Sequence, residues 1–243
     1  MKGKLALLLI ATLCFFRVSW AESNTVKVCT GKAYGVSYDQ LIDRFLTRVF
    51  ADSGLNAQII YVPTKRAEFA FKNRNCDAFF AGTQSFDKLV QRDDIFLVDT
   101  ETIRVNLELY AAKPQASGFS FNLNQLNDAN TSIAFFSSTG MDRFMTQFPK
   151  AAHVPITAIE DGVKLLTKAR VDYFIFPVIM SFKHDALRQV PEDNKVATLA
   201  NVALYIWLDN SYLPYKMALR ESVSNARESL QFKPIFRYAM NSE

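Results

Sequence analysis

The sequence has few residues of the kinds that bind metals or act as nucleophiles and bases. It holds three cysteines and two histidines among 243 residues, and these never fall at the spacings of metal ligands. His153 and His184 have no serine or cysteine in a nucleophile-elbow context, and no pair of carboxylates stands out in the loops after the expected strands. We therefore expect no metal, no cofactor and no catalytic residue, and enzymatic activity is the less favoured alternative.

Beyond its first residues the sequence also lacks an excess of charge and a long apolar run. The chain has 28 Lys and Arg against 24 Asp and Glu, but Lys2, Lys4 and Arg17 lie before residue 22, where no acidic residue occurs, which leaves 25 against 24. No basic stripe or nucleic-acid motif remains, so nucleic acid is not an expected partner. No later segment is long and apolar enough to form a membrane helix.

The first 21 residues have the three parts of an export signal. Lys2 and Lys4 form a basic head, residues 5–16 form an apolar run too short to span a bilayer, and Ser19-Trp20-Ala21 is a small-x-small cleavage site. The sequence therefore predicts a soluble periplasmic protein, a monomer, whose mature chain starts near Glu22.

Two cysteines, Cys29 and Cys76, remain after cleavage. A disulfide can form in an oxidising compartment. We expect Cys29 late in one strand and Cys76 at the start of another, parallel strand, so a bridge would need a favourable offset between them. The sequence leaves the disulfide open and favours two free thiols.

The mature chain contains the same run of elements twice. Strands are expected at 25–29, 57–62 and 77–81, with helices after Ser37 and from 63 to 72; strands at 131–136, 153–156 and 172–176, ended by Pro177, enclose two further helices. Each run closes with a basic residue, an aspartate (Asp77, Asp172) and an apolar strand. We expect the two aspartates to be structural and each run to form a parallel sheet.

The remaining segments fit two lobes joined by crossing strands. Apolar and polar residues alternate from 105 to 111, and an apolar run at 199–208 is a candidate for the return crossing. The segment from 215 to 239 is expected to be helical and to pack on the first lobe. The predicted organisation is an α/β fold with a signal peptide at 1–21, lobe 1 at 22–110 plus 205–243, and lobe 2 at 111–204.

In order and spacing the chain resembles the periplasmic solute-binding proteins of family 3, which have the type II periplasmic-binding fold. The resemblance lies in residues 63–82, the turn at 137–140, and residues 165–172. It implies that a small polar solute binds in the cleft between the lobes, that the lobes close by hinge motion, and that a membrane transporter receives the solute.

The sequence departs from that family at both usual ligand anchors. Where a Thr-x-Thr-x-x-Arg stretch supplies the arginine for a ligand carboxylate, this chain has Thr83, Ser85 and then Lys88, which lacks the bidentate fork. Pro177 stands where an acidic residue commonly receives the ligand ammonium. We therefore do not expect an ordinary amino-acid receptor.

Candidate ligand-binding residues are those in the loops that follow the strands, where ligands sit in open α/β sheets. Arg66, a cation in a helix first turn, suggests anion binding, although a solvated surface arginine is an equal alternative. The turn at 137–140 offers hydroxyl and N–H donors, with N-capping by Thr139 as the alternative. The full candidate set is Tyr34, Tyr38, Arg66, Thr83, Ser85, Ser137, Ser138, Thr139 and Gly140.

Together these observations predict a solute-binding protein that captures a small polar or anionic solute, with an ABC-type membrane permease as partner. One alternative is a periplasmic sensory or interaction protein that signals to a membrane receptor. A less favoured alternative is an enzyme on the same fold.

Overall fold

The computed structural model describes residues 24–31, 36–114, 120–179 and 185–232. The expected signal peptide lies outside these residues, and no described helix is long and apolar enough to cross a membrane. Lobe 1 is built on three parallel strands in the order β2-β1-β3, with two connecting helices: β1 (Thr25–Gly31), α2 (Val36–Asp52), β2 (Asn56–Val62), α3 (Thr64–Lys72) and β3 (Ala78–Gly82).

Lobe 2 repeats this arrangement with its strands in the order β7-β6-β8, again parallel. Its elements are β6 (Ser132–Phe136), α5 (Thr139–Met145), β7 (Ala152–Ile156), α6 (Ile159–Thr167) and β8 (Tyr173–Ile179). The two predicted strand–helix–strand–helix–strand runs are therefore confirmed. The structure does not test the exact lobe boundaries given above, which stay predictions.

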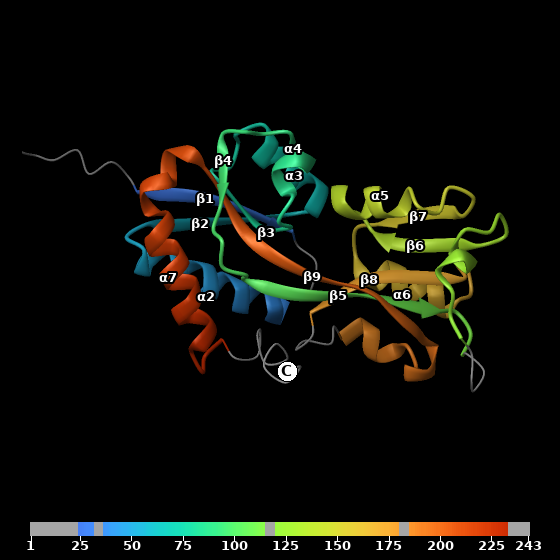
Figure 1. The fold of residues 1–243 in the computed structure, drawn as a ribbon. Coiled ribbons are helices and arrows are strands. Elements are labelled where there is room, and N and C mark those ends of the chain that lie inside the picture. Colours follow the sequence, from blue (N-terminus) through green and yellow to red (C-terminus); the bar gives the residue numbers. More distant parts are fainter. Residues whose placement is uncertain (1–23, 32–35, 115–119, 180–184, 233–243) are drawn as a thin grey trace, which may run out of the picture.

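Two long antiparallel strands, β5 (Ile103–Ala111) and β9 (Lys195–Asp209), connect the lobes. The far end of β9 pairs with β3, and β5 pairs with β8, so both lobes share one nine-stranded sheet. Figure 1 shows the two strands running side by side from one lobe to the other. Both crossings predicted from alternating and apolar runs are confirmed.

The other described elements are short or peripheral. Helix α7 (Lys216–Glu228) packs on α2 of lobe 1, as expected for the C-terminal segment, although residues beyond 232 lie outside the described part. The elements α4 (Phe86–Val90) and β4 (Ile95–Leu97) have no counterpart among the predicted elements. Four 3-10 helices complete the described part of the chain: η1 (Leu123–Leu126), η2 (Asp185–Gln189), η3 (Glu192–Asn194) and η4 (Asn210–Tyr215).

The two repeated aspartates have the same structural role in each lobe. Asp77 Oδ2 accepts a hydrogen bond from the backbone N–H of Lys27 in β1, at 2.8 Å. Asp172 Oδ2 accepts bonds from the backbone N–H of Ser132 in β6, at 2.8 Å, and from its hydroxyl, at 2.6 Å. Each carboxylate thus ties the third strand of its lobe to the first, which confirms that both are structural.

One predicted strand end is wrong. The strand expected to stop before Pro177 continues as β8 to Ile179, with Pro177 opposite Leu107 of β5. Strand β6 pairs with β8 only as far as Ile175. Among the described residues, β8 pairs beyond that point with β5 alone, and proline is tolerated at such an edge of a sheet.

The expectation of two free thiols is also wrong. Cys29 and Cys76 form a disulfide, with their Cα atoms 5.9 Å apart. Cys76 lies before β3, in the segment that leaves α3, and it packs with Cys29 in a buried cluster with Phe71, Phe79 and Trp207. The bridge therefore fixes the segment that leaves α3 to strand β1.

We expect the disulfide to contribute about 4 kcal/mol to the free energy of unfolding, because it closes a long loop in the unfolded chain between cysteines 47 residues apart. The variant Cys29→Ala/Cys76→Ala should lower the urea midpoint by a corresponding amount. Added reductant should lower the midpoint of the unmodified protein and leave that of the variant unchanged. Equal midpoints for all samples would show that the bridge does not stabilise the fold.

Candidate functional site

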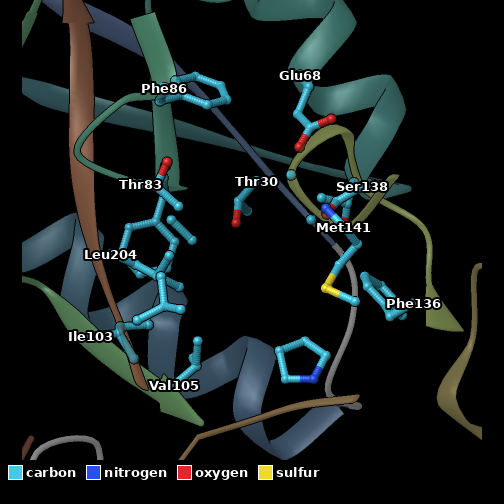
Figure 2. Close-up of a pocket in the computed structure, with 18 of the residues that line it drawn as sticks. Thr30, Glu68, Thr83, Phe86, Ile103, Val105, Phe136, Ser138, Met141 and Leu204 are labelled. Atoms are coloured by element: carbon cyan, nitrogen blue, oxygen red, sulfur yellow. The ribbon is translucent and has the colours of Figure 1, made fainter. Parts of the chain in front are cut away.

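A cavity of about 340 Å³ lies where the two lobes meet. Its walls come from the carboxyl ends of β1, β3 and β6, from α3 and α5, and from the crossing strands β5 and β9. Figure 2 shows Thr83 of lobe 1 across the space from Ser138 and Met141 of lobe 2, with Glu68 of lobe 1 on the same side as Ser138. The cavity has the position expected for a ligand in an open α/β sheet, and its volume falls in the range of small-molecule sites.

Most of the lining is apolar. The crossing strands contribute branched aliphatic side chains, and both lobes contribute phenylalanines. The apolar side chains are Ile42, Phe79, Phe80, Ala81, Phe86, Leu89, Ile103, Val105, Leu107, Phe136, Met141, Phe144, Pro177, Ile179, Ala200, Val202 and Leu204. Such a surface favours a ligand that is itself largely apolar.

The polar lining consists of hydroxyl and acidic groups. Four aliphatic hydroxyl residues are present, Thr30, Thr64, Thr83 and Ser138, together with Asp39, Tyr61 and Glu68. No lysine, arginine or histidine occurs among the described residues of the lining. An anionic ligand would therefore meet carboxylates here and no opposite charge.

Glu68 is a buried carboxylate, 7% exposed, that joins the two lobes. Its Oε2 accepts hydrogen bonds from the backbone N–H of Thr139, at 2.9 Å, and from the Thr139 hydroxyl, at 2.5 Å. Burial raises the pKa of Glu68, while the two bonds from Thr139 lower it in part. The contact holds α3 of lobe 1 against the start of α5 in lobe 2.

An ion pair also joins the same two helices. Lys65 lies one turn before Glu68 on α3, and Asp142 lies one turn after Thr139 on α5. The Lys65 Nζ is 2.5 Å from Asp142 Oδ2, and both side chains are largely exposed. We call the contacts of Lys65 and Glu68 with Asp142 and Thr139 the interlobe latch. Since exposed pairs contribute little, the Glu68 contact carries most of its free energy.

Tyr61 is an uncharged donor on the lobe 1 side. Its hydroxyl donates a 2.8 Å hydrogen bond to the backbone carbonyl of Asp39. Burial raises the pKa of Tyr61, and the nearby carboxylates of Asp43 and Asp39 raise it further. The phenol therefore stays protonated at physiological pH and adds no charge to the cavity.

The end of β3 is shaped by close packing. A β-bulge interrupts its pairing with β9 at Ala81, which has a positive φ of 76°. A Cβ at Gly82 would lie 2.6 Å from Trp207 Cδ1, so only glycine fits there. Trp207 Nε1 in turn donates to the Thr83 carbonyl, at 2.9 Å, and the indole is buried. These contacts place the Thr83 side chain at the cavity wall.

The predicted ligand-binding residues are only partly brought together. Thr83, Ser138 and Gly140 line the cavity, whereas Ser85, Ser137 and Thr139 are absent from its lining. Thr139 was also expected to cap α5, but the cap is Ser138, whose Oγ accepts from the backbone N–H of Met141 at 3.1 Å. Thr139 is thereby free to bind Glu68.

The other predicted ligand-binding residues are not among the described residues that line the cavity. Arg66 is exposed on α3 and does not line it, and Lys88 on α4 is exposed as well. Tyr34 lies outside the described residues, and Tyr38 lies in α2 with its side chain outside them. A ligand contact from any of these residues stays a prediction.

The sequence reading missed Glu68, which forms the main contact between the lobes. The signal that could have found it is its spacing, because Thr64 and Glu68 are four residues apart on one helix and both line the cavity. Strands β5 and β9 were predicted as the crossings between the lobes. The structure adds that their aliphatic side chains line the cavity.

Comparison with known proteins yields matches by structure alone: no family model and no curated protein matches the sequence. The GluR0 ligand-binding core from Nostoc punctiforme, in complex with L-glutamate, shares 14% identity over 87% of this chain and 97% of its own, with a TM-score of 0.66. A histidine kinase sensor domain with similarity to periplasmic binding proteins shares 14% identity over 89% of this chain and 96% of its own, with a TM-score of 0.67.

The substrate-binding protein of an amino acid ABC transporter shares 11% identity over 88% of this chain and 99% of that chain, with a TM-score of 0.64. Each match spans nearly the whole of the other chain. The protein therefore has the two-lobed fold of the periplasmic binding proteins, as the resemblance of its sequence predicts, while its identity to them is low.

The latch allows a test of what holds the lobes together. Glu68→Ala removes two hydrogen bonds to a charged acceptor, worth roughly 1.5–3 kcal/mol each, and should shift the protein toward an open form. Lys65→Ala removes an exposed pair worth about 0–1 kcal/mol and serves as the control on the same helix. Small-angle X-ray scattering should give a larger radius of gyration for Glu68→Ala alone. An unchanged profile would mean that other contacts hold the lobes.

Proposed function

We propose that this protein is a periplasmic binding protein that takes a small, largely apolar molecule into the cleft between its lobes. The observation that carries the proposal is the cavity itself. It lies at the junction of two lobes joined by crossing strands, and each lobe supplies part of its wall. The fold shared with ligand-binding cores and substrate-binding proteins supports binding as the activity.

The lining changes the expected class of ligand. A small polar or anionic solute would need several charged or hydrogen-bonding partners in the cavity. The described lining instead has seventeen apolar residues, four aliphatic hydroxyls and no basic side chain. The two anchors missing from the sequence, an arginine near Lys88 and an acid at Pro177, are replaced in the lining by apolar residues such as Leu89 and Pro177 itself.

For the partner, an ABC-type membrane permease suits a binding protein that serves uptake. The likeness to the substrate-binding protein of an amino acid transporter supports this choice. Signalling to a membrane receptor is the second candidate, supported by the likeness to a histidine kinase sensor domain. In either role, the membrane partner would recognise the form in which the two lobes are closed around the ligand.

The proposal is tested by identifying what the protein binds. The mature chain, purified from its native compartment without denaturation, should carry a small, largely apolar compound that mass spectrometry of the extract detects. Leu204→Trp replaces an aliphatic side chain of the cavity wall by a larger aromatic one. It should abolish co-purification of the compound, because the indole takes up space that the compound needs. Leu213→Trp, at a half-exposed position in η4, is the matched control and should retain the compound.

Two results would contradict the proposal. The first is a compound that co-purifies equally with Leu204→Trp and Leu213→Trp, both folded by circular dichroism, because it would bind elsewhere. The second is turnover of the compound during incubation, which would favour an enzyme on this fold. A stable complex with a membrane sensor, detected in cross-linked membranes, would favour the signalling role over uptake.

A further inference from the structure

We propose that the cavity selects an organic cation, an amine with an apolar body, and that Glu68 is the residue that determines this choice. The inference rests on the proposed function, because it names the class of ligand for the same cavity. Three observations carry it: the charges of the lining, the hydrogen bonding of Glu68, and the aromatic rings around the space.

The charged groups of the described lining are all acidic. Asp39 and Glu68 come from two different helices, α2 and α3, and no basic residue accompanies them in the lining. A charge enclosed in an apolar cavity is unfavourable unless an opposite charge lies close. Lys65 attracts the Glu68 carboxylate from outside the lining, and a ligand ammonium would supply an opposite charge inside it, whereas a ligand carboxylate would add to the repulsion.

Glu68 has one carboxylate oxygen to offer. Its Oε2 accepts both bonds from Thr139. Its Oε1 accepts no hydrogen bond from the described residues, and this oxygen is not fully buried. The side chain lines the cavity, and Figure 2 shows it extending from α3 toward the space beside Ser138 and Met141. An N–H donor on a ligand can therefore bind Oε1 while Oε2 keeps the lobes together.

The same contact disfavours a ligand carboxylate. Ser138 and Gly140 line the lobe 2 edge of the cavity, and the backbone N–H and hydroxyl of Thr139, which lies between them in the sequence, both already donate to Glu68. A carboxylate that needed them would have to displace a buried Glu68 carboxylate, breaking two charge-assisted hydrogen bonds. An amino acid would meet this cost at one end even if its ammonium were well placed.

Aromatic rings supply the remaining part of the site. Phe79 and Phe86 are stacked with their ring centroids 4.3 Å apart, and both line the cavity, as do Phe136 and Phe144 of lobe 2. Phe79 and Phe86 cover each other's faces and form an apolar wall, while a ring face that turns toward the space would attract a cation as well. Carboxylate, aromatic rings and aliphatic side chains together suit an ammonium group attached to an apolar body.

The test uses three probes of equal shape and different charge: 2-phenylethylamine, 2-phenylethanol and 3-phenylpropionate. Titration calorimetry should give the amine an affinity at least about tenfold above that of the alcohol, because both probes can donate to the carboxylate but only the amine adds the attraction of opposite charges, and the carboxylate probe should bind weakest. Glu68→Gln should reduce the affinity for the amine to that for the alcohol. The glutamine carbonyl still accepts from Thr139, so affinity for the alcohol should not change.

The control variant is Glu221→Gln, which changes the net charge equally at an exposed position on α7 and should leave all three affinities unchanged. The inference is overturned, and the proposed function stands, if the alcohol binds as tightly as the amine or if the co-purified compound proves to be a carboxylate. Equal losses for amine and alcohol in Glu68→Gln also overturn it. If none of the probes binds and no compound co-purifies, the proposed function itself fails.

Discussion

The buried carboxylate of Glu68, bound by Thr139, is the interaction on which the cleft depends. Two lobes connected by strands β5 and β9 would otherwise be free to separate, since the shared sheet constrains their spacing more than their opening. The contact brings α3 to α5 and so encloses a space between the strand ends. Burying this carboxylate costs free energy, and the two hydrogen bonds from Thr139 offset that cost.

The lobes themselves are held by contacts that do not involve the cleft. Asp77 and Asp172 fix the third strand of each lobe to the first, and the disulfide fixes α3 to lobe 1. Because α3 carries both lobe 1 residues of the latch, its rigid attachment transmits any movement of α5 to the sheet as a whole. Strong bonds within each lobe and a few bonds between them favour motion of the lobes as units.

The architecture could be predicted from the sequence because its signals are local. The spacing of apolar residues within about ten positions distinguishes a helix from a strand. The repeated pattern that ends in Asp77 and Asp172 indicates the two lobes. The cavity could not be predicted in the same way. Glu68 and Thr139 are 71 residues apart, and the sequence around either residue does not indicate a contact with the other. The disulfide between Cys29 and Cys76 and the extension of β8 past Pro177 both depend on strand register. The hydrophobic pattern leaves that register undetermined for strands buried on both faces.

In the proposed role of Glu68, one side chain takes part both in joining the lobes and in selecting the ligand. A ligand that donates to Glu68 Oε1 leaves the bonds from Oε2 to Thr139 in place, so it can bind while the lobes stay joined. A ligand that competes for Thr139 can bind only as the latch opens, and its affinity is reduced by the free energy of the latch. Since the coupling between two such equilibria is reciprocal, strengthening the latch would sharpen the preference for cations, and weakening it would admit anions.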